Sequence, residues 1–333
     1  MPKKVSEEHA ELFHYTGAAG LAGILESQTL RATHYSYLND SEEVRLFFDR
    51  GLRSLLEAEV REGLRSLANA PGNQKLIDEI GGFKNAVTDS LNGLVTGIRQ
   101  STIAFNEPYM LSFCSSRSPS VRSDGLLSQW RGYGKEGGYA IVFDPLGIEV
   151  LLEMEESTFH YQHVQIGDVH YYDDKESSEV VQLAEEIQQA QRVLKASVLE
   201  FLLNHDPARL EPTYEAVTTL SCLTKHWGFH EECEVRVVMV PAEHSVAAQA
   251  QSVGFTKPLK PRRFFNRDGC PVPYISLFDK RSSTGQKQSL PISRIIVGPH
   301  RDKERRKHAV ELLLEAHEIE AKVSTSDIPY IGN

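Results

Sequence analysis

Residues 233–240 read CEVRVVMV, and Pro241 follows them. Val and Met dominate this run, which is the composition and length of a buried β-strand, and Pro241 ends it because proline has no backbone N–H. Glu232, Glu234 and Arg236 recur at period two as the chain enters this strand, so their side chains are expected on one face. Charged groups on a buried strand must pair or meet a ligand, and the pattern alone is compatible with both.

Other short apolar runs surround this strand, and stretches with helical periodicity separate them. The alternation is not the regular strand–helix–strand of a parallel sheet. It favours an α+β fold, with a mixed or antiparallel sheet core in one domain spanning 1–333 and helical insertions at about 41–105 and 177–227. Strands are expected at 12–16, 30–34, 109–115, 139–144, 164–172, 262–265, 273–278, 292–298 and 321–324. Helices are expected at 17–28, from a cap at 39–41 onward, and at 75–105, 126–133, 177–203, 212–227 and 303–317.

The charge balance is acidic. The 333 residues include 36 Lys and Arg against 46 Asp and Glu, a formal charge of −10. This balance argues against an extensive non-specific grip on nucleic acid. The four cysteines form no CxxC pair, and no apolar run has the length or flanks of a membrane span or signal peptide. We therefore expect a cytoplasmic protein with no membrane partner.

Three further segments carry polar groups suited to a ligand. His14, Tyr15 and Thr16 lead into a glycine-containing helix start, where free N–H groups can hold an anion. Ser112 and the hydroxyls that follow it end a strand, a position that suits ribose and phosphate contacts. Trp130, Arg131 and Tyr133 combine aromatic rings and a cation, which can stack on a planar ring. Each segment also has a structural interpretation: a core-packed histidine, a polar loop and a tryptophan that fills the core.

The sequence contains none of the usual motifs for zinc or for nucleotides. Cys222, His226, His230 and Cys233 lie within twelve residues, but their spacing matches no usual zinc motif, and HWGFHEE is not HExxH. We therefore expect no metal. No dinucleotide-binding GxGxxG, Walker A motif or nucleophile elbow is present.

The ordered landmarks resemble a known family, the bacterial domain of unknown function 2971. They are His14-Tyr15-Thr16, Leu38-Asn39-Asp40 with Glu42 or Glu43, Leu111-Ser112-Phe113, Trp130 with Tyr133, Gly138 to Asp144, Lys225-His226, Phe229 with Glu232, Glu234 and Arg236, and Ile295 to Pro299.

A weaker resemblance links the His-Tyr-Thr strand and the late Glu-x-Glu strand to ADP-ribosyltransferases. It implies an ADP-ribosyltransferase-like fold and NAD as substrate. His14 would hold the ribose, Glu234 would be the catalytic glutamate, Glu232 would contact the acceptor and Ser112 would brace Glu234. Tyr15, Tyr133 and Tyr139 compete as the ring that stacks on nicotinamide, and Thr16, Trp130, Arg131 and Arg236 complete the expected binding site.

The resemblance therefore predicts an enzyme that transfers ADP-ribose to a macromolecular acceptor or hydrolyses NAD. The role implied is that of a bacterial toxin or an anti-phage defence effector. Two alternatives stay open: a nuclease-like effector that processes nucleic acid, and a non-enzymatic module that senses a ligand. Self-association as a homo-oligomer also stays open.

Overall fold

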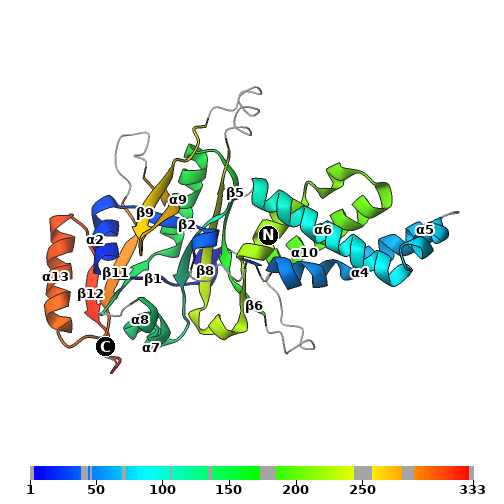
Figure 1. Ribbon diagram of the computed structural model, residues 1–333. Helices are drawn as coiled ribbons and strands as arrows, with labels where there is room; N and C mark the ends of the chain where they lie inside the picture. Colours follow the sequence, from blue (N-terminus) through cyan, green and yellow to red (C-terminus); the bar gives the residue numbers. More distant parts are fainter. Residues whose placement is uncertain are drawn as a thin grey trace.

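The computed structural model describes residues 4–38, 44–45, 47–69, 73–105, 107–133, 137–172, 185–243, 257–279 and 289–329. Within these ranges the strands form one mixed sheet of ten strands and a separate two-stranded pair, β6–β7 (Figure 1). The expected α+β class with a mixed sheet is confirmed. The strands are β1 (Leu12–Thr16), β2 (Leu30–His34), β3 (Tyr109–Cys114), β4 (Tyr139–Phe143), β5 (Tyr161–Asp168), β6 (His170–Tyr172), β7 (Thr224–His226), β8 (Glu234–Pro241), β9 (Arg262–Arg267), β10 (Cys270–Leu277), β11 (Ile292–Val297) and β12 (Lys322–Thr325).

The sheet forks at β3. One edge of β3 pairs antiparallel with β8 along its whole length, and β8 pairs in turn with β5. The other edge is shared, because β1 pairs with β3 at Cys114 while β2 pairs with it at Tyr109 and Met110. From β1 the sheet continues through β4, β11 and β12, and from β2 it continues through β10 and β9. The two arms therefore meet only at this strand.

Helices lie on both faces of the sheet and extend beyond its end. The helices are α1 (Val5–Glu8), α2 (Ala18–Ser27), α4 (Leu52–Ala68), α5 (Asn73–Glu79), α6 (Phe83–Phe105), α7 (Pro119–Asp124), α8 (Leu127–Tyr133), α9 (Pro145–Thr158), α10 (Glu185–Asn204), α11 (Thr213–Cys222) and α13 (Lys303–Ala316). The short turns are η1 (Tyr35–Tyr37), η2 (Phe47–Gly51), η3 (Pro207–Leu210) and η4 (Trp227–Glu232).

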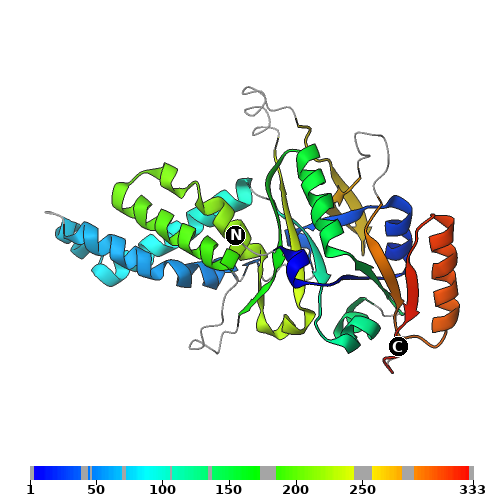
Figure 2. The ribbon, with the colours of Figure 1, turned by 180° about the vertical axis from the view of Figure 1, so that it is seen from behind.

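The main core lies between the sheet and helices α1, α2, α9 and α13, which Figure 2 shows from behind. Its sheet side chains include Leu12 on β1, Phe113 on β3 and Val235 on β8. Helix α9 begins sharply because Asp144 Oδ2 accepts a hydrogen bond from Gly147 N at 2.9 Å and Pro145 stands in the first turn.

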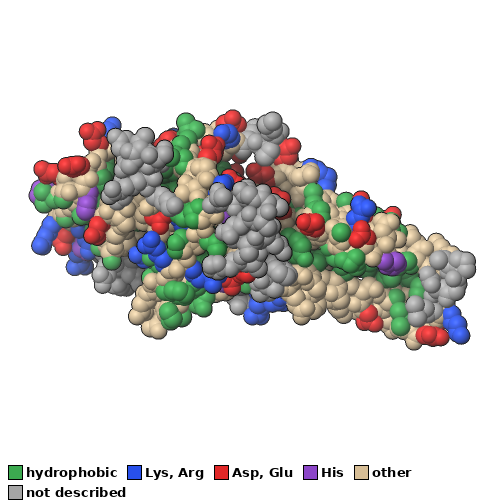
Figure 3. Space-filling view, turned by 90° about the horizontal axis from the view of Figure 1, so that it is seen from above, with side chains coloured by type: hydrophobic (Ala, Val, Ile, Leu, Met, Phe, Trp, Pro, Cys, Tyr) green, Lys and Arg blue, Asp and Glu red, His purple; other side chains and the backbone are tan. Residues whose placement is uncertain are grey.

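Helices α4, α5, α6, α10 and α11 project together from one end of the molecule (Figure 1). Helix α4 packs against both α6 and α10, although α10 follows more than 110 residues later. An apolar cluster runs through this helical block and reaches the sheet at Met110 and Val238. From above, acidic, basic and hydrophobic side chains alternate along the molecule (Figure 3).

Several element boundaries differ from expectation. The helix expected at 75–105 is broken at Gly81 and Gly82, whose positive φ angles of 89° and 93° do not fit a helix. The helix expected at 212–227 ends at Cys222 and gives way to β7 and η4. The strand expected at 164–172 is two strands, because the buried Val169 turns the chain and donates its N–H to the Glu234 carbonyl at 2.8 Å. The polar loop expected after β3 contains α7. The cap at 39–41 and residues 177–184 of the expected helix lie outside the described residues.

Candidate functional site

Glu234 and Arg236 form a buried ion pair on β8. In the β3–β8 register Glu234 lies opposite Cys114 and Arg236 opposite Ser112, so all four side chains share one face of the sheet. Arg236 Nε donates to Glu234 Oε1 at 2.7 Å, and Arg236 Nη1 donates to the Cys222 carbonyl at 2.5 Å. Each of the two charged residues is only 3% exposed. The ion pair that the sequence pattern allowed therefore exists, and both of its partners are buried.

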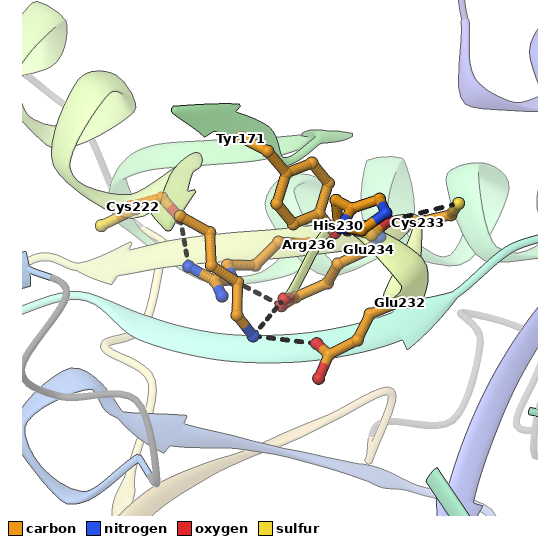
Figure 4. Close-up of polar contacts among 8 residues, drawn as sticks. Tyr171, Cys222, His230, Glu232, Cys233, Glu234 and Arg236 are labelled. Atoms are coloured by element: carbon orange, nitrogen blue, oxygen red, sulfur yellow. Dashed lines mark hydrogen bonds and ion pairs between the residues drawn. The ribbon is translucent and has the colours of Figure 1, made fainter. Parts of the chain in front are cut away.

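Lys225 joins this pair to a second carboxylate. It extends from β7, which pairs with β6, and it is 1% exposed. Its Nζ lies 2.9 Å from Glu232 Oε2 and 3.0 Å from Glu234 Oε2 (Figure 4). One ammonium thus holds both glutamates of the Glu-x-Glu segment.

The charges in this cluster balance. Burial raises the pKa of Glu234, but Arg236 and Lys225 outweigh burial and, with hydrogen bonds from Arg236 and Ser112, lower that pKa to about 2. Glu234 is therefore ionised at neutral pH, with Oε1 and Oε2 both occupied by cations. Glu232 differs because its side chain is 18% exposed and lies in η4, ahead of the strand.

The sheet face beside this cluster is open at Ser112. Ser112 is exposed although it stands in the middle of β3, with a strand on either side. On one side of it lies the apolar cluster of Phe13, Tyr15 and Trp130, and on the other lies the cluster that contains Met110. A central strand is normally covered on both faces, so the exposed serine marks a gap in the covering layer.

Exposed aromatic rings lie in the same turn as Glu232. Turn η4 carries Trp227 and Phe229, which are 48% and 38% exposed. Lys225 Nζ lies 4.6 Å from the centre of the Phe229 ring, and the Trp227 and His230 rings stack at 4.2 Å. Flat, exposed rings next to ionised carboxylates are suited to a planar, cationic or polar ligand.

The backbone at the edge of the site is strained. Cys233, immediately before Glu234, has φ 41° in the left-handed region, which is unfavourable for a residue with a side chain. Its carbonyl accepts from Ser115 N at 3.0 Å, which ties the strained residue to the end of β3. This conformation turns the chain from η4 into β8 and so places Glu232 and Glu234 around Lys225.

His14 is not part of this cluster. Phe13 lies opposite Cys114, so the next residue, His14, points to the opposite face of the sheet from Glu234. Its Nδ1 lies 3.3 Å from the Ser112 carbonyl, and burial lowers its pKa. The expected pairing of His14 with the two glutamates is therefore wrong, because the strand register separates them.

The remaining expected residues divide between the faces. Tyr15 and Trp130 pack edge to face at 4.9 Å on the face that carries Glu234, and Tyr15 Oη accepts from Leu126 N at 2.8 Å. Arg131 and Tyr133 are exposed on α8. Tyr139 is buried in the main core on the other face, opposite Thr16. Tyr139 therefore cannot stack on a ligand held at the carboxylates.

Sequence reasoning gave no role to Lys225, which appeared only as a family landmark. Its role depends on the pairing of β6 with β7, and the local pattern there predicts helix instead. Cys222, His226, His230 and Cys233 do not form a metal-binding cluster within the described residues: Cys222 is buried, and the Cys233 thiol lies 3.7 Å from the His230 carbonyl.

Two cavities lie away from the carboxylates. One, of about 580 Å³, opens between β10 and residues 241–243 and 259–262. The other, of about 710 Å³, lies between β5 and helices α10 and α11. Neither is lined by Glu232 or Glu234.

None of the described helices has both the length and the hydropathy needed to cross a membrane. A search among curated proteins found no match, and neither did a search among solved structures. Residues 129–237 span Trp130, Lys225, Glu232, Glu234 and Arg236, and this segment matches the family model described as "Protein of unknown function (DUF2971)", which supports the family that the ordered landmarks resemble.

Proposed function

We propose that the protein cleaves the nicotinamide–ribose bond of NAD and transfers the ADP-ribose to an acceptor or to water, on an ADP-ribosyltransferase-like fold. The observation that carries the proposal is the pair of carboxylates held by Lys225 beside the exposed Ser112. Glu-x-Glu on a late strand is also the element of the sequence that resembles ADP-ribosyltransferases.

The chemistry requires a fixed negative charge. As nicotinamide leaves, the ribose develops oxocarbenium character, and a carboxylate already in place stabilises this charge more than it stabilises bound NAD. The ion pairs with Lys225 and Arg236 fix the two glutamates before a substrate arrives. A preorganised carboxylate needs no reorientation during the reaction.

The burial of the two glutamates assigns them different roles. Glu234 has a cation on each oxygen and is 3% exposed, so it acts as the positioning residue that orients Lys225. Glu232 shares Lys225 and is the more exposed of the two, so it is the carboxylate that faces the ribose. This assignment reverses the roles that the resemblance implies for the two glutamates. His14 makes no ribose contact in the proposed site, because it lies on the other face of the sheet.

Aromatic and hydroxyl groups complete the proposed site. Trp227 and Phe229 offer exposed ring faces on which nicotinamide or adenine can stack. The hydroxyl of Ser112 is accessible for a hydrogen bond to a ribose hydroxyl. Of the three tyrosines considered for stacking, Tyr133 is 50% exposed on α8, whereas Tyr15 and Tyr139 are buried, so Tyr133 is the one whose ring is accessible to a ligand.

The test is nicotinamide release from NAD, followed by mass spectrometry together with ADP-ribosylated products in added lysate. Glu232→Gln should lower the turnover about 10²–10³-fold, the usual effect of removing one electrostatic stabiliser of a transition state. Glu231→Gln is the matched control, because Glu231 is an exposed neighbour in the same turn, and it should keep full turnover.

Two outcomes would overturn the proposal. The first is no nicotinamide release by the wild-type protein with either water or lysate as acceptor. The second is full activity in a correctly folded Glu232→Gln variant, which would remove this carboxylate from the reaction. If NAD raised the thermal stability without being consumed, the site would be a binding module instead.

A further inference from the structure

A second cluster of titratable groups lies at the opposite face of the sheet, around His9. His9 directly follows α1, and its ring lies between the ends of β3 and β5. His9 Nδ1 lies 2.7 Å from Ser115 Oγ, and His9 Nε2 lies 2.7 Å from Asp168 Oδ1. Glu8 joins them, since one ligand atom from each of Glu8, His9 and Asp168 lies within 4.8 Å of the others.

The contacts of Ser115 hold the His9 ring against Asp168. Ser115 Oγ lies 2.7 Å from His9 Nδ1 and 3.3 Å from the Glu11 carbonyl, so the serine fixes the orientation of the imidazole. His9 Nε2 is thereby directed at the Asp168 carboxylate, 2.7 Å away, an arrangement of a ring nitrogen and a carboxylate oxygen that can bind a cation.

The surroundings of this contact are negative. Glu186 lies against Gly167, where a Cβ atom would come within 2.8 Å of Glu186 Oε2. Burial first, and the charges of Asp168 and Glu8 in addition, raise the pKa of Glu186. The carboxylates of Glu8 and Asp168 therefore flank the imidazole, and Glu186 adds negative charge from the other face of the sheet, where Gly167 lies opposite Arg236.

The cluster resembles a Ser-His-Asp triad in composition, but its geometry excludes nucleophilic catalysis by Ser115. The serine is 6% exposed, and its hydroxyl is directed at the backbone of Glu11 rather than at solvent. A nucleophile must instead be open to its substrate. Asp168, 38% exposed in its side chain, is the accessible member of the contact, and Glu8 is exposed as well.

We propose that Glu8, His9 and Asp168 bind a divalent transition metal ion, with zinc the best fit to one imidazole and two carboxylates. Ligands at ~2.0–2.2 Å on a tetrahedral ion stand ~3.3 Å apart, so the His9–Asp168 contact needs to open by only ~0.6 Å. The Ser115–Glu11 link then orients the imidazole as an outer-shell partner, and water completes the coordination. This site departs from the metal-free protein that the sequence suggested.

The metal would fasten α1 to the strand ends that support the carboxylate site. Ser115 N donates to the Cys233 carbonyl at 3.0 Å, next to Glu234. The site is nevertheless on the face of the sheet opposite Glu234, since Asp168 lies opposite Val235 in the β5–β8 register. It therefore acts as a structural clamp and takes no part in the proposed cleavage of NAD.

The test is zinc binding by the full chain after treatment with a chelator, measured by calorimetry and as the rise in melting temperature on adding zinc. His9→Gln and Asp168→Asn should abolish the rise, and Ser115→Ala should weaken binding about 10–100-fold, as outer-shell changes do. His308→Gln is the matched control, because His308 is an exposed histidine beside Glu311, and it should bind zinc like the wild type. Cobalt in place of zinc gives a visible spectrum that reports the ligand set.

Two results would overturn the site. The first is zinc binding by His9→Gln as tight as that of the wild type, which would assign the zinc to surface histidines. The second is an equal loss of stability in His9→Gln with and without zinc, which would make the His9–Asp168 contact a simple ion pair. Neither result depends on nicotinamide release, so failure of this proposal is distinguishable from failure of the proposed function.

Discussion

Replacing Glu234 by Gln should remove a pH-dependent part of the stability. The structure lowers the pKa of Glu234 to about 2, from the ordinary glutamate pKa of 4.5. This lowering of the pKa corresponds to ~3 kcal/mol of folding free energy at neutral pH, since each tenfold change in the acid dissociation constant is worth about 1.36 kcal/mol. Because the pKa is depressed in the folded state, this contribution is fully present above the unfolded pKa and is lost as the pH falls from about 4.5 towards 2.

The assay is urea unfolding followed by circular dichroism, at several values between about pH 7 and pH 3. At neutral pH Glu234→Gln should be less stable than the wild type by about 3 kcal/mol, and this difference should narrow as the pH falls below about 4.5, to roughly half at pH 3. Glu57→Gln is the control, because Glu57 pairs with Arg61 on an exposed helix surface, and it should change the stability by less than about 1 kcal/mol. A loss below about 1 kcal/mol in Glu234→Gln at neutral pH, with parallel curves in acid, would refute the buried, ionised state of Glu234.

Four further substitutions test the structure elsewhere, each by urea unfolding. Lys260→Met should cost about 3–5 kcal/mol, because this lysine is 0% exposed in its side chain and its loss leaves the buried Glu155 carboxylate without its cation, whereas Asp279 keeps Arg263; a neutral result would contradict the network. Gly125→Ala should destabilise the protein by more than about 1 kcal/mol, because φ is 79° there and the new Cβ would meet the Trp130 ring at 2.5 Å. Gly93→Ala should instead stabilise it by about 0.4–1 kcal/mol, because Gly93 is exposed on a helix and has open space for the Cβ. Asp144→Ala should cost about 1 kcal/mol by removing the cap of α9, and no loss would show that the cap is dispensable.

Much of the fold could be predicted from local patterns. The run at 139–143 is buried at every residue, and continuous apolar strands of this kind carry a strong signal. The helix predicted at 212–227 is wrong beyond Cys222, although the spacing of its apolar and polar residues is compatible with a helix. Strand β7 forms there through its pairing with β6, a contact between segments some fifty residues apart. Local spacing does not report such long-range pairing.

The candidate site was predictable as chemistry but not as geometry. Glu234 and Arg236 share one face of β8, as period two predicted, whereas Glu232 lies in η4 and joins them through Lys225. Lys225 could not be assigned, since it reaches them from a different sheet. The prediction that His14 joins the glutamates was wrong because the face on which His14 lies depends on which β3 residue pairs with β1. The sequence of a five-residue strand does not determine this register.

The helical block has a consequence for how the chain is made. Its first part, ending at Phe105, leaves the ribosome about 80 residues before Glu185, where α10 begins. At 5–20 residues per second this interval lasts ~4–16 s. Throughout it, the apolar stripe of Leu52, Leu56 and Val60 lacks the α10 surface that later buries it completely. Until α10 is made, the nascent chain therefore exposes an apolar surface that chaperones can bind and through which chains can aggregate. The rate of synthesis between residues 105 and 204 should influence the yield of folded protein more than the rate elsewhere.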